Sequence, residues 1–371
     1  MFSPGEISLP LRIVSYRITL FAYPHDRIIG DSQVLSDHIY MGFLELINEA
    51  GMVGTGFFFR LFNPLPSYST MHTLFDCEIA PLFLNEYPAV LLNRITRPRG
   101  GNRTSFPYNI DQALDLALWD LHAQEMNLPL FQLLGGARER IRVYASGLEF
   151  HLSDEDTAAF YEKIVILGYT AFKIKMGHPQ LEWELNRLRL ITDIVGKKAV
   201  LMVDANEAWS PKETIRRINT YMNAGYNIYW VEDPCLREDF DGLRAISAAL
   251  PTVHVNTGEY LTLQGKMQLI EVKGVDILNI HGHISDGMKA GWLASEAGIR
   301  ISLGNTPLEV GVHLACALPE VDWMEYSFLN YNHLVDNPVR IEDGFAYPPQ
   351  KPGHGLRLSE VARKEFGIYE K

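Results

Sequence analysis

The sequence predicts an α/β protein in which a TIM-type (β/α) barrel follows a smaller α+β domain. From residue 140 onward, short apolar strands alternate with amphipathic helices eight times over roughly 190 residues, as they do in a (β/α) barrel. Before that point, extended runs come first and helical runs follow, which is typical of an α+β unit. The 371 residues, 47% of them apolar, are enough to bury a core in each part.

An antiparallel sheet is expected near the N-terminus. Residues 12–23 and 39–60 mix β-branched and aromatic residues, and residues 49–51 (Glu-Ala-Gly) supply a turn between extended runs. This pattern predicts a small sheet of hairpin-connected strands.

Helices are expected after this sheet. Residues 71–86 are weakly periodic, whereas residues 109–134 carry apolar residues at helical spacing. The second pattern is broken at Pro129 and ended by Gly135 and Gly136. The sheet and its helices together predict an α+β capping domain.

Eight strand candidates follow, separated by helical patterns. Residues 210–213 (Ser-Pro-Lys-Glu) give the clearest helix start, with an N-cap, a proline at the first helical position and a capping-box glutamate. The strand candidates are RVYASG, TAFKIKMG, AVLMVDANEAW, IYWVEDP, VHVNTGEY, VDILNIHGH, RISLGN and DWMEYSF. In a (β/α) barrel the chemistry gathers at the C-terminal ends of the strands, so polar residues at these ends become candidates for function.

Nearly every predicted strand ends in such a residue. Residues spaced by two on one strand point to the same face, so both members of a pair can face the barrel mouth. The candidates are Lys173 and Lys175 on the second strand, Asp204 and Asn206 on the third, Glu232 on the fourth, Glu259 on the fifth, His281 on the sixth and Glu325 on the eighth.

Three carboxylates in succession predict a metal site. Asp204, Glu232 and Glu259 lie at three successive strand ends, separated by 28 and 27 residues, and should be neighbours on the rim. A hard divalent cation with oxygen ligands relieves their mutual repulsion, and Mg²⁺ fits best because it leaves positions open for substrate oxygens. The alternative is that each acid caps the next helix or pairs with an arginine.

The two lysines suggest acid–base chemistry. A metal ion and a neighbouring ammonium both disfavour the charged form, which lowers a lysine pKa toward the range of a general base. We therefore expect Lys175 to be the base and Lys173 to stay protonated, where it would stabilise an enediolate together with Mg²⁺. The alternative is an ordinary exposed pair of lysines.

Composition excludes several other classes. The net charge of −12 and the lack of a Lys/Arg-rich stretch argue against a nucleic-acid partner. Three widely separated cysteines indicate neither a disulfide framework nor a zinc site. The N-terminus lacks a secretory pattern, and no window reaches 18 apolar residues, so we expect a cytoplasmic protein without membrane contact.

The ordered set Lys-x-Lys, Asp-x-Asn, Glu-Asp-Pro and Gly-Glu resembles the enolase superfamily, and within it the mandelate racemase group. The resemblance covers essentially the whole chain, including ALDLALWDLHAQEMNLPLFQLLGG and the closing PPQKPGHGLRLSEVARKEF. It implies an α+β cap over residues 1–138, a modified (β/α)₇β barrel over residues 139–335 and a return to the cap over residues 336–371.

The resemblance also implies roles for the site residues. It places Mg²⁺ on Asp204, Glu232 and Glu259 and makes Lys175 the base. It further suggests that Asn206 contacts the site, and that Glu325, as a protonated acid, donates a hydrogen bond to the enediolate opposite Lys173.

One departure from the group matters. An Asp after strand six and a His after strand seven usually form a second acid–base dyad, but this chain has His281 and Leu303-Gly304-Asn305 at those places. His281 would then act from the face opposite Lys175, as an acid toward a leaving hydroxyl or as a proton donor. Alternatively, His281 or His283 only bonds a loop carbonyl, and His313 is expected to pack in an apolar helix.

These observations favour an acid-sugar dehydratase that forms a 2-keto-3-deoxy acid. A racemase or epimerase that uses Lys175 and His281 on opposite faces is the second enzyme hypothesis. A metal-binding protein without turnover, which serves as a sensor or assembly partner, is the third.

Substrate choice is expected to depend on two cap loops. They should correspond to residues 22–35, with His25 and Arg27, and to residues 54–66, where Arg60 would meet a distal carboxylate or lie on the surface. The family resemblance suggests a homo-oligomer, either a dimer or an octamer.

Overall fold

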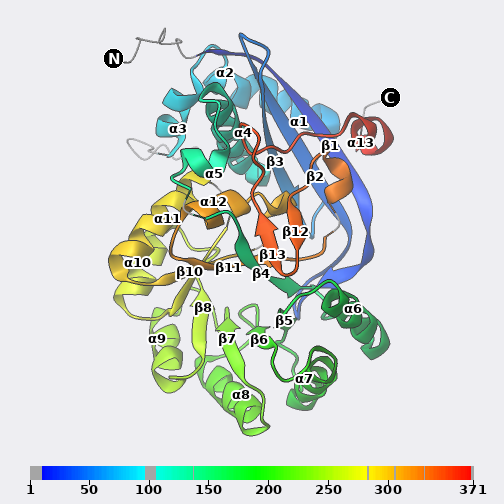
Figure 1. Cartoon of the computed structure of the whole chain (residues 1–371), viewed down its shortest axis with the longest axis vertical. Coiled ribbons are helices and arrows are strands. Elements are labelled where there is room, and N and C mark those ends of the chain that lie inside the picture. The colour runs from blue at the N-terminus through cyan, green and yellow to red at the C-terminus, as the bar shows by residue number, and fades with distance from the viewer. Residues whose placement is uncertain are drawn as a thin grey trace.

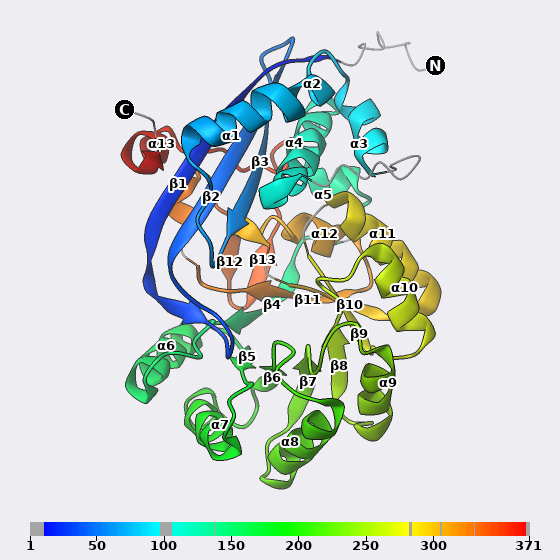
Figure 2. The ribbon, with the colours of Figure 1, turned by 180° about the vertical axis from the view of Figure 1, so that it is seen from behind.

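The computed structural model describes residues 11–96, 106–136, 138–281, 284–304, 306–329 and 331–368. His283 and Asn305, named above, lie outside the described residues. The N-terminal sheet and its helices occupy one end of the molecule and the barrel occupies the other (Figure 1). The view from behind shows the long strands of the sheet running from the far end of the cap down to the barrel (Figure 2).

The cap is built on an antiparallel sheet in the order β14-β1-β2-β3. Its strands are β1 (Ile13–Gly30), β2 (Leu35–Asn48), β3 (Val53–Arg60) and β14 (Gly367–Ile368). Successive side chains alternate between the two faces, so Phe58 packs on the cap helices while Phe57 joins the core shared with the barrel. Gly54 and Gly56 let the backbone of a helix lie directly against β3, where a Cβ would meet the carbonyls of Ala117 and Ala113.

The cap helices cover the outer face of this sheet. They are α1 (Tyr68–Leu74), the π-helix η1 (Phe75–Ile79), α2 (Ala80–Phe83), α3 (Pro88–Thr96), the 3₁₀-helix η2 (Pro107–Asn109), α4 (Ile110–Glu125) and α5 (Leu130–Leu133). The predicted break at Pro129 is confirmed, because it separates α4 from α5. The predicted run 71–86 contains three short pieces.

The prediction of two cap loops is wrong for most of their length, because these residues form strands. Residues 22–30 continue β1, and residues 54–60 belong to β3. The turn-like residues after Pro24 instead coincide with a register shift between Pro24 and Ile29. A proline is tolerated in a strand at such an irregularity, because the ladder is already interrupted there.

The barrel has the predicted architecture. Its eight parallel strands run from β4 to β11 and are closed by pairing of β11 with β4. They are β4 (Ile141–Ser146), β5 (Ala171–Lys175), β6 (Val200–Asp204), β7 (Ile228–Glu232), β8 (His254–Thr257), β9 (Ile277–Ile280), β10 (Arg300–Leu303) and β11 (Val321–Tyr326).

Helices follow the first seven strands. They are α6 (Asp154–Ile166), α7 (Leu181–Val195), α8 (Pro211–Asn223), α9 (Phe240–Ala249), α10 (Leu263–Glu271), α11 (Ile284–Ala297), and the pair η3 (Pro307–Glu309) and α12 (Val312–Ala317). The eighth strand leads instead through the short η4 (Asn332–Leu334) to a hairpin of β12 (Arg340–Glu342) and β13 (Phe345–Tyr347). The expected (β/α)₇β form is therefore confirmed.

The C-terminal segment does two things. The hairpin first extends the barrel sheet, because β13 pairs with the start of β4. Only afterwards does the chain return to the cap, where α13 (Glu360–Phe366) leads into β14 beside β1. The described part of the chain contains no helix long and apolar enough to span a membrane.

Side chains divide the barrel interior into an apolar floor and a polar mouth. Tyr144, Met202, Trp230 and Trp323 pack together inside, with the rings of Tyr144 and Trp230 edge to face at 5.1 Å. Above them, the strand register sets Lys175 beside Asp204 and Asp204 beside Glu232. The polar residues of neighbouring strands therefore reach the rim at one level.

Candidate active site

The two lysines of β5 are buried in the barrel mouth. Lys173 Nζ lies 2.7 Å from Glu232 Oε1, 3.2 Å from Asp204 Oδ2 and 2.9 Å from Glu325 Oε1. Lys175 Nζ donates to Asp204 Oδ2 at 2.6 Å and to Asn206 Oδ1 at 2.9 Å. With exposures of 2% and 4%, they are not an ordinary exposed pair.

Electrostatics within this group are strongly coupled. Burial is the largest single influence on the pKa of Lys175 and lowers it, but the Asp204, Glu325 and Glu232 carboxylates together outweigh burial, so the pKa is raised. Among the protein's own groups, the acid that contacts Lys175 affects its pKa more than the neighbouring Lys173 does. Burial raises the pKa of Glu232 well above its usual range, and the nearby Asp204 and Glu325 carboxylates raise this pKa further.

Two of the three predicted metal ligands lie in this group. Asp204 and Glu232 contact the same ammonium, Lys173 Nζ, and Glu232 keeps one buried oxygen, Oε2, without a hydrogen-bond partner among the described residues. Glu259 lies beyond the end of β8, close enough for its charge to raise the pKa of Glu232. The predicted ligands therefore share one side of the mouth.

The present arrangement is not a formed metal site. Within the described ranges, no three Asp, Glu, His or Cys side chains are grouped closely enough to hold one ion. Lys173 and Lys175 lie among the carboxylates, and Lys173 bridges Asp204 and Glu232. The donor chemistry still suits a hard cation, because each of the three residues offers carboxylate oxygens and Glu232 Oε2 is unbonded.

An amide network beneath the carboxylates escaped sequence reasoning. Asn279 on β9 donates to Glu232 Oε1 at 3.3 Å, and Ser302 on β10 bridges Asn279 and Asn256. All three are fully buried. Their shared position could have revealed them, since Asn256, Asn279 and Ser302 each lie one residue before the last residue of their strand.

Backbone strain gathers at the same rim. Asn206, Glu207 and Asp233 have φ values of 44°, 63° and 37°, in a region that side-chain-bearing residues rarely adopt. Such conformations persist where the surrounding structure fixes them, and they often cluster at functional sites.

His281 lies at the predicted strand-six exit but outside the lysine–acid group. Its ring meets the Tyr260 ring edge to face at 5.5 Å. A pocket of about 240 Å³ is lined by His281 together with Glu259, Lys266 and Asp286. The structure therefore brings His281 beside Glu259. His313 is fully buried and bonded to the backbone of Phe131 and His354, as expected for a packing residue.

The cap contributes side chains to the mouth. Arg27 donates to the carbonyls of Gly147 and Phe328 at 2.8 and 3.0 Å, which ties β1 to the exits of the first and last barrel strands. Gln33 donates to the carbonyl of Asn206. His25 has two ring nitrogens that are buried and lack a hydrogen-bond partner among the described residues, and burial lowers its pKa to about 4.

Arg60 is occupied locally. Its guanidinium donates to the carbonyl of Pro64 at 3.3 Å and lies over the Tyr108 ring at 5.7 Å. Neither contact reaches the lysine–acid group.

Two further buried carboxylates were missed in the sequence. Glu149, 1% exposed, follows β4 and accepts the backbone N–H of Lys175 at 3.1 Å. Glu309, 7% exposed, follows β10, and burial raises its pKa to about 8. Both lie beyond the predicted strand segments RVYASG and RISLGN, so the strand-exit rule did not select them.

Comparison with known proteins places the chain in a family. Residues 156–362 match the enolase C-terminal domain-like family, and residues 38–135 match the N-terminal domain of mandelate racemase and muconate lactonizing enzymes. L-Talarate/galactarate dehydratase of Salmonella typhimurium is 32% identical over 68% of this chain and 66% of its own length. L-Ala-D/L-Glu epimerase of Bacillus subtilis is 30% identical over 66% of this chain and 69% of its own length.

Solved structures agree over nearly the whole chain. A Mesorhizobium loti protein named provisionally as a mandelate racemase is 47% identical, with a TM-score of 0.92 over 96% of this chain and 95% of that one. L-Talarate dehydratase of Polaromonas sp. JS666, solved with Mg and L-glucarate, is 27% identical, with a TM-score of 0.83 over 97% and 98% of the two chains. The chain therefore belongs to the enolase superfamily, in the mandelate racemase group.

Proposed function

We propose that this protein is an Mg²⁺-dependent enzyme that removes the α-proton of a carboxylic acid, and that it dehydrates an acid sugar to a 2-keto-3-deoxy acid. One observation carries the proposal: Lys173 and Lys175 lie buried side by side among Asp204, Glu232 and Glu325. Relatives that are dehydratases of acid sugars support the substrate class.

Asp204, Glu232 and Glu259 would hold the cation. When bound, Mg²⁺ supplies positive charge that stabilises the substrate carboxylate as its negative charge increases. A cation bound to Asp204 would also compete with the Lys175 ammonium for the Asp204 carboxylate. The ammonium of Lys175 would then lose the partner that raises its pKa, which favours the neutral amine that a general base requires.

The chain's own residues then divide the work. Neutral Lys175 Nζ takes the proton from the α-carbon, and the electron pair moves into an enediolate. Lys173, still protonated, and Glu325 face the oxygens that become negative. In the dehydration, the bond from the β-carbon to its hydroxyl breaks, and His281 gives the departing oxygen a proton so that it leaves as water. The enol product then tautomerises to the keto acid.

The test is α-proton exchange. The protein with Mg²⁺ in D₂O is offered mono- and di-acid sugars, exchange is followed by NMR, and keto-acid release is followed with semicarbazide. Exchange with keto-acid release on one acid is the expected result. Exchange without release would favour an epimerase, and no exchange on any acid while Mg²⁺ binds would contradict both enzymatic proposals and favour a metal-binding protein without turnover.

The epimerase is the second candidate because dipeptide epimerases are among the relatives of this chain at 30% identity. Lys175 and His281 would then serve opposite faces of one carbon. We also propose a homo-oligomer, which analytical ultracentrifugation of the full chain tests.

A further inference from the structure

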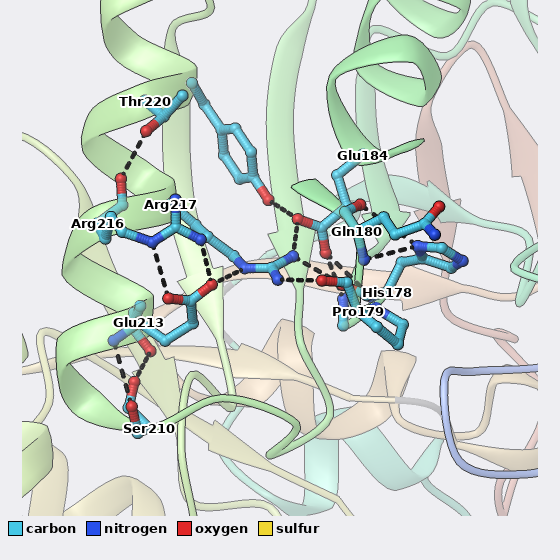
Figure 3. Close-up of polar contacts among 12 residues, drawn as sticks. His178, Pro179, Gln180, Glu184, Ser210, Glu213, Arg216, Arg217 and Thr220 are labelled. Atoms are coloured by element: carbon cyan, nitrogen blue, oxygen red, sulfur yellow. Dashed lines mark hydrogen bonds and ion pairs between the residues drawn. The ribbon is translucent and has the colours of Figure 1, made fainter. Parts of the chain in front are cut away.

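A polar network outside the mouth holds the loop that follows Lys175 (Figure 3). Lys175 is the last residue of β5, and the chain then turns through residues 177–180 before α7 begins at Leu181. Gly177 has a φ of 94°, and a Cβ at this position would lie 2.6 Å from Ser32 Oγ of the cap. The loop therefore turns sharply in a narrow space beneath the cap.

Glu184 of α7 binds backbone N–H groups of this loop. It is fully buried, and its Oε1 accepts the backbone N–H groups of Gly177 and His178 at 2.9 and 3.0 Å. Its other oxygen accepts from Tyr221 Oη at 2.5 Å and from Arg217, both on α8.

Arg217 binds backbone carbonyl groups of the same loop. Its guanidinium donates to the carbonyls of His178 and Pro179 at 2.7 and 3.0 Å. Figure 3 shows the side chains of Glu184 and Arg217 meeting at the loop from two neighbouring helices. Two opposite charges, both less than 5% exposed, thus satisfy the polar backbone atoms directly after β5.

Stability alone is a weak explanation for such a pair. Burying two charges costs several kcal/mol per ion, and replacing a buried pair with apolar residues of similar size is often neutral or stabilising. What apolar residues cannot reproduce is the set of bonds to the loop backbone. Those bonds fix where β5 ends, and with it the direction of Lys175.

We propose that Glu184, with Arg217 as its counter-ion, is a positioning residue for Lys175. This inference rests on the proposed function, because Lys175 is the proposed base. The network keeps the amine of Lys175 aligned with the substrate α-carbon, where a displacement of about 1 Å can cost on the order of a hundredfold in rate.

The test compares wild type with the double variant Glu184→Leu/Arg217→Met, which removes both charges and the loop bonds but keeps apolar volume. We expect the variant to fold but with a lower Tm, because it leaves backbone N–H and C=O groups of the loop unpaired. Below that Tm it should lose about 10- to 100-fold in kcat for α-proton exchange and keep KM nearly unchanged. Glu184→Gln, which retains an oxygen for the two N–H groups, should recover part of kcat. Glu213→Gln is the matched control, because Glu213 also pairs with Arg217 but contacts no residue of the loop through its side chain.

A second readout does not need turnover. Labelling of Lys175 by an amine-reactive anhydride at one pH, followed by peptide mass spectrometry, should be faster in the double variant than in wild type and unchanged in Glu213→Gln. A folded double variant with wild-type kcat and labelling would overturn the inference. If wild type exchanges no acid, the proposed function fails, and unchanged labelling would still overturn the positioning role on its own.

Discussion

The exits of β5, β6 and β7 differ from those of β9 and β10 in what surrounds their titratable side chains. On the first side, Lys173 and Lys175 contact acids at 2.6 to 3.2 Å. On the second side, His281 meets the Tyr260 ring, and burial is the sole cause of the raised pKa of the Glu309 carboxyl. We propose that the first side carries the proton abstraction and that the second side decides whether dehydration or epimerisation follows.

The largest expected effect follows from removing Lys175 on the first side. Lys175→Ala removes the proposed base, so α-proton exchange should fall by about 10³-fold, within the usual range for a general base. NMR in D₂O with the best acid substrate measures it. Lys163→Ala, on an exposed face of α6, is the control and should keep the wild-type rate. Retention of exchange in Lys175→Ala would remove the distinction between the two sides.

The next expected effect concerns Glu309 on the second side and the dependence of protein stability on pH. Burial raises the pKa of Glu309 to about 8, whereas an unfolded glutamate titrates near its usual value of 4.5. Between these values the unfolded chain has lost its proton and the native chain retains it. The contribution of Glu309 to stability is therefore full below about pH 4.5 and is lost as pH rises through 8, by on the order of 5 kcal/mol.

Glu309→Gln should abolish this loss, because its side chain does not ionise. Urea unfolding at pH 5.5, 7 and 8.5 measures the free energy of unfolding of both proteins. The exposed Glu296→Gln is the control and should keep the wild-type slope. Parallel pH dependence of wild type and Glu309→Gln would show that Glu309 is ionised in the native state.

The sequence predicted the barrel and its rim but did not identify every buried group around them. The barrel and its rim followed from strand spacing, because Lys175, Asp204 and Glu232 end their strands and the parallel register aligns them. Glu184 was not selected, since an acid in the first turn of an amphipathic helix has the pattern of a surface residue. Its importance comes from tertiary contacts with α8, which spacing along one chain does not reveal.

The cap was harder to predict for a different reason. Pro24 and the polar residues after it have the composition of a loop, but β1 continues through them as an irregular strand. The side chains that this strand carries over the mouth, Arg27 above all, depend on that irregularity for their direction.

A smaller effect concerns the metal. Glu232→Gln keeps the shape of the side chain but removes a charge from the proposed ligand set, so Mg²⁺ affinity should fall by about a hundredfold. Isothermal titration of Mg²⁺ into each protein measures this. Glu238→Gln, exposed on the loop after β7, should bind as wild type does. Equal affinity in all three proteins would argue against Glu232 as a ligand.

The smallest expected effect separates the two reactions. If His281 protonates the departing hydroxyl, His281→Asn should lower keto-acid release by at least about tenfold while α-proton exchange catalysed by Lys175 continues. Both rates can be followed in one D₂O experiment, and the exposed His333, whose ring contacts Tyr23, supplies the control variant His333→Asn. An epimerase behaves differently, because loss of His281 would leave exchange of one enantiomer and abolish conversion between the two. Equal loss of exchange and release would mean that His281 acts on the α-proton step itself, and the division between the two sides of the mouth would then be wrong.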